Sequence, residues 1–151
     1  MGGASEDMSE KWRKFLQYTG EIADLVSATA VLAWDQQTYM PSGGIQTRAS
    51  QLATLQKHIH LLLTREEVGS LLGELEEEMA HLPYDSFEAS LLRAARRSSE
   101  KAARLPTKLV SELAHVASLA LDAWLRAKAA SDFNVFRPHL EELVIKKREQ
   151  A

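Results

Sequence analysis

Apolar residues recur every three or four positions along most of the chain, which is the period of an amphipathic helix. A first stripe begins at Trp12, and Leu25, Val31 and Leu32 lie off it, so we expect a first helix that is buried on two sides. No segment alternates between apolar and polar residues over a useful length, and strands are therefore not expected. The stripe consists of Trp12, Phe15, Leu16, Ile22, Ala23, Val26 and Ala30.

Proline and glycine separate the periodic segments. The sequence MPSGG at residues 40–44 ends the first helix, and a second apolar face follows over 45–62. The sequence LPY at residues 82–84 ends a third helix, while Pro106 suits the first turn of a fifth and Pro138 opens the last. We therefore predict an all-α chain of about six helices, several of them joined as antiparallel hairpins.

Two polar motifs predict where helices begin. Residues 64–67 (TREE) have the spacing of a capping box, in which Thr64 accepts a hydrogen bond from the N–H of Glu67 and Glu67 reaches back. Residues 85–88 (DSFE) repeat the same logic one helix later. The inward positions expected on the third, fourth and fifth helices are Val68, Leu71, Leu72, Leu75, Met79, Leu91, Leu92, Ala95, Leu109, Leu113, Val116, Ala117, Ala120, Trp124 and Ala127.

Composition narrows the class of protein. The chain has 151 residues, a length that suits one domain with a real core, and its formal net charge is −3. This charge gives no general attraction to nucleic acid or anionic lipid, so neither is an expected partner. The absence of cysteine excludes disulfides and thiolate metal sites. No apolar run approaches the roughly 18 residues of a membrane span, and we expect a cytoplasmic protein.

Two Glu-x-x-His motifs raise the possibility of a metal site. Glu78 with His81, and Glu112 with His115, place a carboxylate and an imidazole on one helix face, as in di-iron bundles. Such a site also needs a lone inward glutamate from each of two other helices, and no candidate stands out. Exposed amphipathic faces are the better interpretation, with the di-iron bundle kept as an alternative. His-Glu-x-x-His, the common zinc-peptidase motif, does not occur in the sequence.

Charged residues also cluster on two successive helices. The basic cluster could bind phosphate, but its spacing spreads the charges over one helical face. If the two helices form a hairpin, the acidic and basic clusters pair or lie in solvent, and we favour this interpretation. The basic cluster is Arg93, Arg96, Arg97, Lys101 and Arg104, and the acidic cluster is Glu74, Glu76, Glu77 and Glu78.

The exit of the first helix, LAWDQQTYMPSGG at residues 32–44, carries more polar groups than a helix end needs. Trp34 is expected to anchor the core, as are Trp12 and Trp124. Asp35 is ionised and needs water or a donor, so it either caps a neighbouring helix or binds Arg48. From the residues alone, a structural corner is the favoured interpretation and a surface that faces a ligand is the alternative. The candidate residues are Trp34, Asp35, Gln36, Thr38, Tyr39, Met40, Pro41 and Arg48.

Three blocks, in order, carry a family resemblance. They are WDQQTYMPSGG with TRASQLATLQKHIHLLLT, then LPTKLVSELAHVASLALDAWLRAKAASDF, then FRPHLEELVIKKREQA. Together they resemble the N-terminal region of the M32 metallocarboxypeptidases, the carboxypeptidase Taq family, over nearly the whole chain from about Trp12. Ser42 and Gln37 depart from the family pattern, where a second proline and a glutamate are common.

The resemblance implies a mostly helical, cytoplasmic enzyme, usually a homodimer, that removes C-terminal residues from peptides. It implies a divalent zinc or cobalt ion in the full-length enzyme, held by a His-Glu-x-x-His motif and a downstream glutamate. Those elements lie C-terminal to the matched region, so no catalytic residue and no metal ligand is assigned to this segment. The final helix runs to Ala151 without a terminator, which agrees with a truncated N-terminal part covering residues 1–151.

The leading hypothesis is therefore an N-terminal helical segment that forms a wall or lid beside the substrate groove and is inactive alone. Whether this chain is itself an enzyme is left open. Its implied partners are peptide substrates and, in the full-length enzyme, a second subunit. The alternatives are a free-standing helical interaction module and the di-iron bundle.

Overall fold

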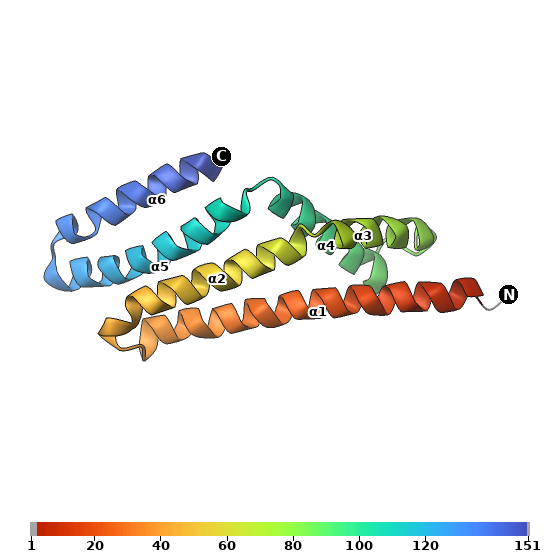
Figure 1. Cartoon of the computed structure of the whole chain (residues 1–151), viewed down its shortest axis with the longest axis horizontal. Helices are drawn as coiled ribbons and strands as arrows, with labels where there is room; N and C mark the ends of the chain where they lie inside the picture. The colour runs from red at the N-terminus through yellow and green to blue at the C-terminus, as the bar shows by residue number, and fades with distance from the viewer. Residues whose placement is uncertain (1–2, 151) are drawn as a thin grey trace. The chain divides into compact units, whose positions relative to one another are not determined.

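The computed structural model describes residues 3–150, with side chains described from residue 10 onward, so both ends of the predicted segment 1–151 lie outside the described residues. The described part is helical and contains no strand, which confirms the predicted all-α class (Figure 1). The elements are α1 (Gly3–Thr38), η1 (Ser42–Gly44), α2 (Ile45–Leu63), α3 (Glu66–Glu78), α4 (Phe87–Ala103), α5 (Thr107–Ala130), η2 (Phe133–Val135) and α6 (Arg137–Gln150).

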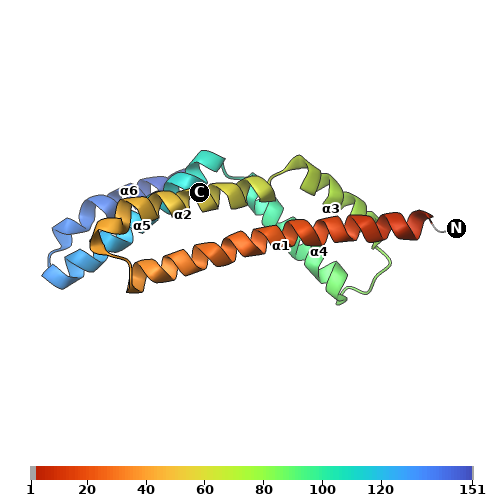
Figure 2. The ribbon, with the colours of Figure 1, turned by 60° about the horizontal axis from the view of Figure 1, so that its bottom comes forward.

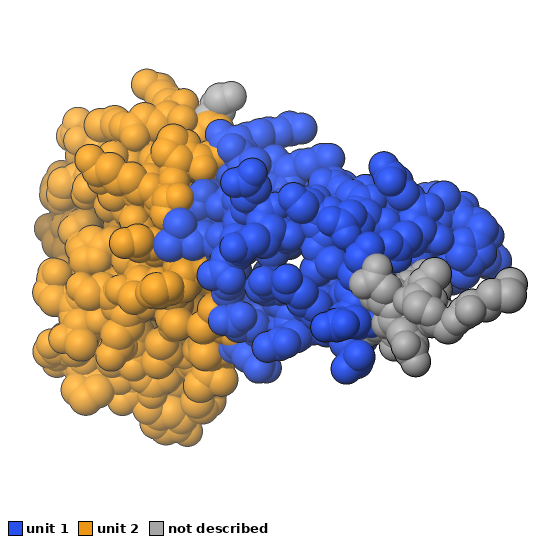
Figure 3. Space-filling model, turned by 45° about the vertical axis from the view of Figure 1, so that its right-hand side comes forward, with its two compact units in different colours: residues 1–24, 60–104 blue, residues 25–59, 105–151 orange. Residues whose placement is uncertain are grey.

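The chain divides into two compact units, coloured separately in Figure 3. One, the α3–α4 unit, contains residues 1–24 and 60–104, and the other, the α5–α6 unit, contains residues 25–59 and 105–151. Helices α1 and α2 each contribute residues to both units. The units are described separately below.

A small apolar core holds the α3–α4 unit together. Leu72 and Leu75 are fully buried, and Phe15 of α1 is only 1% exposed. On the surface, Arg96 of α4 donates to Glu76 of α3, with 2.7 Å between Nη2 and Oε2, and this contact raises the pKa of Arg96. The prediction that the acidic and basic clusters pair is therefore confirmed for these two residues. The core consists of Phe15, Val68, Leu71, Leu72, Leu75 and Leu92.

The predicted capping box at residues 64–67 is wrong. Thr64 continues the backbone hydrogen bonding of α2, and its hydroxyl donates to the carbonyl oxygen of His60 at 2.8 Å. Arg65 takes the extended backbone conformation of an N-cap instead, without a side-chain cap. At residues 85–88 the predicted helix start is confirmed, but the cap is Ser86 and not Asp85, because the Ser86 hydroxyl accepts a hydrogen bond from the N–H of Ala89 at 3.3 Å.

The α5–α6 unit contains the second part of α1 and most of α2 together with a helical hairpin. Helices α5 and α6 lie side by side in both views of Figures 1 and 2. Ser131 ends α5 in the left-handed conformation with φ 52°, and Asp132 caps η2 by accepting from the N–H of Asn134 at 3.0 Å. No residue of α6 is buried. The buried apolar residues of this unit are Ala49, Leu52, Ile59, Leu109, Val116, Ala120, Ala123 and Ala127.

The prediction that the first helix is buried on two sides is wrong for its second half. Phe15 is buried, but Val26 is 49% exposed, Val31 is 63% exposed and Trp34 is 58% exposed. Trp34 is therefore not the core anchor expected from the sequence, and Trp124, at 45% exposed, is only half-buried. Helical periodicity identifies an apolar face, but it does not show whether a neighbour covers that face.

Among the described residues, no helix combines the length and the apolar character needed to cross a bilayer.

Candidate functional site

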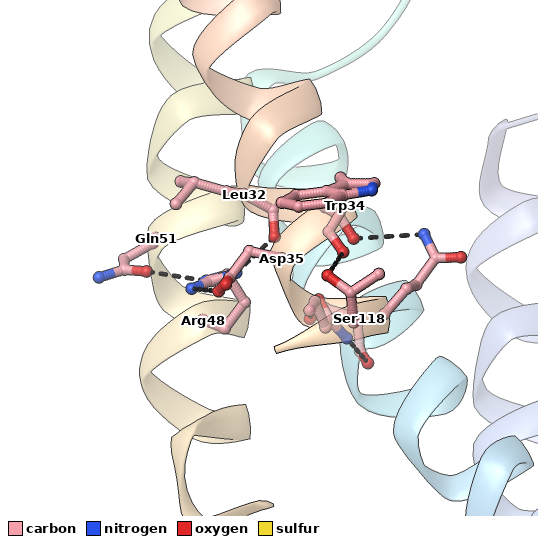
Figure 4. Close-up of polar contacts among 10 residues, drawn as sticks. Leu32, Trp34, Asp35, Arg48, Gln51 and Ser118 are labelled. Atoms are coloured by element: carbon pink, nitrogen blue, oxygen red, sulfur yellow. Dashed lines mark hydrogen bonds and ion pairs between the residues drawn. The ribbon is translucent and has the colours of Figure 1, made fainter. Parts of the chain in front are cut away.

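Arg48 joins the end of α1 to the start of α2 (Figure 4). Its Nη2 lies 2.6 Å from Oδ2 of Asp35, which confirms the predicted pairing. Its Nη1 donates to the carbonyl oxygen of Leu32, and its Nε donates to Oε1 of Gln51 at 3.1 Å. The Arg48 side chain is 12% exposed and that of Asp35 is 34% exposed. We call this group of contacts the Arg48 corner.

The guanidinium group is well suited to this corner. Three of its nitrogens donate to three different acceptors, and the planar group holds these donors in a fixed fork. The backbone carbonyl of Asp35 also accepts from the N–H groups of Tyr39 and Met40, at 3.0 and 2.9 Å. Asp35 therefore closes the end of α1 with its backbone and ties α1 to α2 with its side chain.

Gln36 points to a different neighbour. Its Nε2 donates to the backbone carbonyl of Ser118 at 2.9 Å, and the Ser118 hydroxyl donates to Oε1 of Gln36 at 2.8 Å. Ser118 lies on α5 and is 5% exposed, so this reciprocal pair satisfies a buried polar group. The sequence analysis missed Ser118. A serine inside the apolar stripe of the fifth helix is the signal that would have indicated a polar partner there.

Thr38 and Tyr39 do not reach across to another helix through a described hydrogen bond. The Thr38 hydroxyl donates to the carbonyl oxygen of Trp34 one turn earlier, at 2.9 Å. Tyr39 is 77% exposed, and its ring lies 5.5 Å from that of Trp34 in an edge-to-face arrangement. Trp34 and Tyr39 therefore form an exposed aromatic pair at the end of α1.

The turn after α1 is compact. Pro41 precedes the short helix η1, and its carbonyl accepts from the N–H of Gly44 at 2.8 Å. A Cβ atom on Gly44 would lie 3.2 Å from Cγ of Met40, which is closer than most such contacts. Glycine at this position therefore lets the Met40 side chain pack against the turn. Met40 and Pro41 shape the turn, and neither has a polar side-chain group to offer a ligand.

The Glu-x-x-His motifs do not form a metal centre. Among the described residues, no group of three or more histidine, aspartate or glutamate side chains is placed to hold a metal ion. Glu112 accepts from Nζ of Lys146 at 2.8 Å, a contact that lowers the pKa of Glu112 and raises the pKa of Lys146. Glu78 is bound to Lys11. Both carboxylates are thus engaged by ammonium groups, and the di-iron alternative has no donor set.

A mostly apolar groove of about 470 Å³ lies within the α5–α6 unit. Gln36 and Ser118 both line it, and Ala33 of the α1 exit lines it as well. Its walls come from α1, α2, α5 and α6, and they include Leu52, Leu113 and Leu143. Such a surface can accept apolar groups, and it contains no cluster of residues suited to bond-making chemistry.

The sequence of this chain is similar to that of known proteins. Residues 14–151 match the family described as Carboxypeptidase Taq (M32) metallopeptidase. Thermostable carboxypeptidase 1 of Thermus thermophilus is 31% identical over 140 residues, which is 93% of this chain and 28% of the relative. Carboxypeptidase 1 of Bacillus subtilis is 29% identical over 132 residues, which is 87% of this chain and 26% of the relative.

Solved structures agree with the sequence comparison. The crystal structure of BsuCP superposes with a TM-score of 0.87 at 26% identity, over 93% of this chain and 28% of that one. The structure of Pyrococcus furiosus carboxypeptidase gives a TM-score of 0.65 at 28% identity, with the same two coverages. The chain thus spans little more than a quarter of the length of the relatives that it matches.

Proposed function

Because the chain belongs to the Carboxypeptidase Taq (M32) metallopeptidase family, we propose that it forms the helical wall or lid of a metal-dependent carboxypeptidase. The observation that carries this proposal is the match over residues 14–151, which corresponds to 28% of a relative such as the Thermus thermophilus enzyme. On this proposal the enzyme releases C-terminal amino acids from peptides, and the bond-breaking chemistry belongs to the part of the family fold outside the matched region.

The residues that the structure describes do not fit a catalytic metal. No described cluster offers three ligands, and the carboxylates of both Glu-x-x-His motifs, Glu78 and Glu112, are bound to lysines. We therefore place the zinc or cobalt ion of the complete enzyme elsewhere, and we assign no chemical step to this segment. A homodimeric enzyme and a cytoplasmic location remain predictions.

The role that this segment can perform is geometric. Arg48 and the Gln36–Ser118 pair connect α1 to α2 and to α5 within the α5–α6 unit. These contacts hold the walls of the apolar groove in place. Such a wall shapes access for an extended peptide and excludes large folded substrates, while the reaction takes place on other residues.

A graft tests the proposal. The matching N-terminal region of full-length Bacillus subtilis carboxypeptidase 1 would be replaced by this chain, and release of C-terminal amino acids from peptides would be measured with added Zn²⁺ or Co²⁺. We expect metal-dependent release by the graft and none by the isolated 151-residue chain. Metal-dependent turnover by the isolated chain would show that the segment is more than a wall. A folded but inactive graft would refute the proposed role.

The coding sequence gives a second, independent test. A His-Glu-x-x-His motif encoded after Ala151 would support the proposal that the segment belongs to a complete peptidase. A stop codon directly after Ala151, together with a monodisperse and cooperatively melting chain, would instead support the free-standing interaction module. Both outcomes can be read without knowing the substrate.

A further inference from the structure

The second half of α1 carries an apolar surface that this chain leaves uncovered. Val26, Val31 and Trp34 are 49%, 63% and 58% exposed, and Ala30 between them is exposed as well. Each residue of a helix advances by about 100°, so these four positions share one side of α1. We call them the α1 stripe. All four belong to the α5–α6 unit.

The opposite side of the same helix makes the internal contacts. Leu32 and Gln36 are directed to α2 and α5 through hydrogen bonds to Arg48 and Ser118, while Asp35, about 40° around the helix from Val31, borders the stripe and binds Arg48. Gln36 lies about 200° around the helix from Trp34. Trp34 and Ala30 therefore lie away from Leu32 and Gln36, while Val31, next to Asp35, lies at the border of the internal contacts.

A face of this kind has to be explained. Single exposed apolar residues are ordinary on protein surfaces, but a tryptophan and two valines on one helix face form a contiguous patch typical of an interface. Val26 and Ala30 are four residues apart, and Val31 and Trp34 are three apart. These are the spacings of the ridges that a helix presents to a packed neighbour. Trp34 is the natural centre, because tryptophan is enriched among residues that dominate binding energy.

The comparisons indicate the occupant. In the relatives the matching helices form 28% or less of a single longer chain, so nearly three quarters of each relative lies outside them. Building on the proposed function, we propose that the α1 stripe is the surface on which this segment docks to the remaining, peptidase-bearing part of an M32-type chain. The docking partner is a mostly helical protein surface, and Trp34 inserts into it.

The test compares one substitution in two settings. The double variant Val31→Gln/Trp34→Gln removes the apolar surface and keeps good helix propensity. In the isolated chain we expect the thermal midpoint to change by no more than about 2 °C, because both side chains are mostly exposed and Trp34 loses only its contact with the exposed ring of Tyr39. In the Bacillus subtilis graft we expect the midpoint to fall by roughly 4 °C or more, because a covered apolar surface is lost.

A matched control comes from the other unit. Phe87 is 68% exposed and lies at the start of α4, outside the α1 stripe. The substitution Phe87→Gln removes a similar exposed ring, and we expect it to leave the midpoint of the graft within about 1 °C of its starting value. A graft that is equally sensitive at Phe87 and at the α1 stripe would show that the stripe has no special role, and would overturn the docking proposal.

Three further outcomes distinguish failure of the docking proposal, failure of the proposed function, and docking of a second copy of this chain. An active graft that tolerates the double variant would overturn the docking surface and leave the proposed function standing. A folded but inactive unmodified graft would overturn the proposed function and the docking proposal with it. If the isolated chain sediments as a dimer that the double variant dissociates, the occupant is a second copy, and the proposal is wrong.

Discussion

The Arg48 corner gives the most direct energetic prediction, which is that Asp35 and Arg48 stabilise the α5–α6 unit by acting together. The perturbation is a double-mutant cycle made of Asp35→Ala, Arg48→Ala and the variant with both substitutions. Such a cycle isolates the interaction between two side chains from everything else that each substitution removes.

The structure sets the size of the expected coupling. Nη2 of Arg48 lies 2.6 Å from Oδ2 of Asp35, and the arginine side chain is 12% exposed while the aspartate side chain is 34% exposed. A hydrogen bond to a charged group contributes about 1.5–3 kcal/mol when well buried, whereas a fully exposed pair contributes about 0.2–1 kcal/mol. Because water screens the aspartate in part, we expect a coupling of about 1–2 kcal/mol.

The single substitutions are expected to differ. Arg48→Ala also removes the donors to the Leu32 carbonyl and to Gln51, so it should cost about 2–3 kcal/mol of unfolding free energy. Asp35→Ala removes only the carboxylate and should cost about 1–2 kcal/mol. The order of these two values is itself a prediction, because a corner organised around the aspartate would reverse it.

Urea unfolding followed by far-ultraviolet circular dichroism supplies the four free energies of unfolding. The matched control is a second cycle on Arg137 and Glu141, a pair in α6 that is 2.9 Å apart with side chains 64% and 61% exposed. We expect about 0.3–0.5 kcal/mol there. If the coupling at Asp35 and Arg48 does not exceed that of the control pair, the claim that this corner holds the helices together is refuted.

Two further predictions concern the core and the dependence of stability on pH. Leu72→Ala should cost about 2–5 kcal/mol by urea unfolding, because Leu72 is 0% exposed, whereas Leu61→Ala at a 43% exposed site should cost less than about 1 kcal/mol. The contact between Glu112 and Lys146 lowers the pKa of Glu112 and raises the pKa of Lys146. The pair therefore stabilises the fold fully between about pH 5 and 10, where both groups are charged. This contribution is lost as pH falls through the lowered pKa of Glu112 or rises through the raised pKa of Lys146. The difference in thermal midpoint between the unmodified chain and Glu112→Gln should therefore shrink toward pH 3, and a difference that stays constant would contradict the pair's role.

Local and periodic features were predictable from the sequence. Helical periodicity with proline and glycine breaks predicted the six helices, and the ionised Asp35 after a tryptophan predicted a donor such as Arg48. These predictions succeed because they depend on short-range geometry or on the high cost of leaving a charge without a partner. The family resemblance also rests on local motifs, and the match over residues 14–151 confirms it.

Features that depend on a distant neighbour were not predictable. The capping box at Thr64 has the right spacing, but α2 continues its hydrogen bonding into that residue and uses the hydroxyl itself. The side-chain partner of buried Ser118 is Gln36, which is 82 residues away in the sequence. The exposure of Val31 and Trp34 depends on what is packed against α1, and a periodic pattern carries no information about that.

The polar residues at the exit of α1 take part in architecture, which supports the structural interpretation of the exit. Asp35 is bound by Arg48, Gln36 by Ser118, and the Thr38 hydroxyl by a carbonyl one turn earlier. Each of these side chains already has a partner inside the segment, so binding a substrate there would require breaking an existing contact. The most exposed large side chains at the exit are the aromatic pair Trp34 and Tyr39. This arrangement supports the proposal that the exit packs against another protein surface, while Gln36, on the wall of the apolar groove, combines an internal bond with access to a cavity.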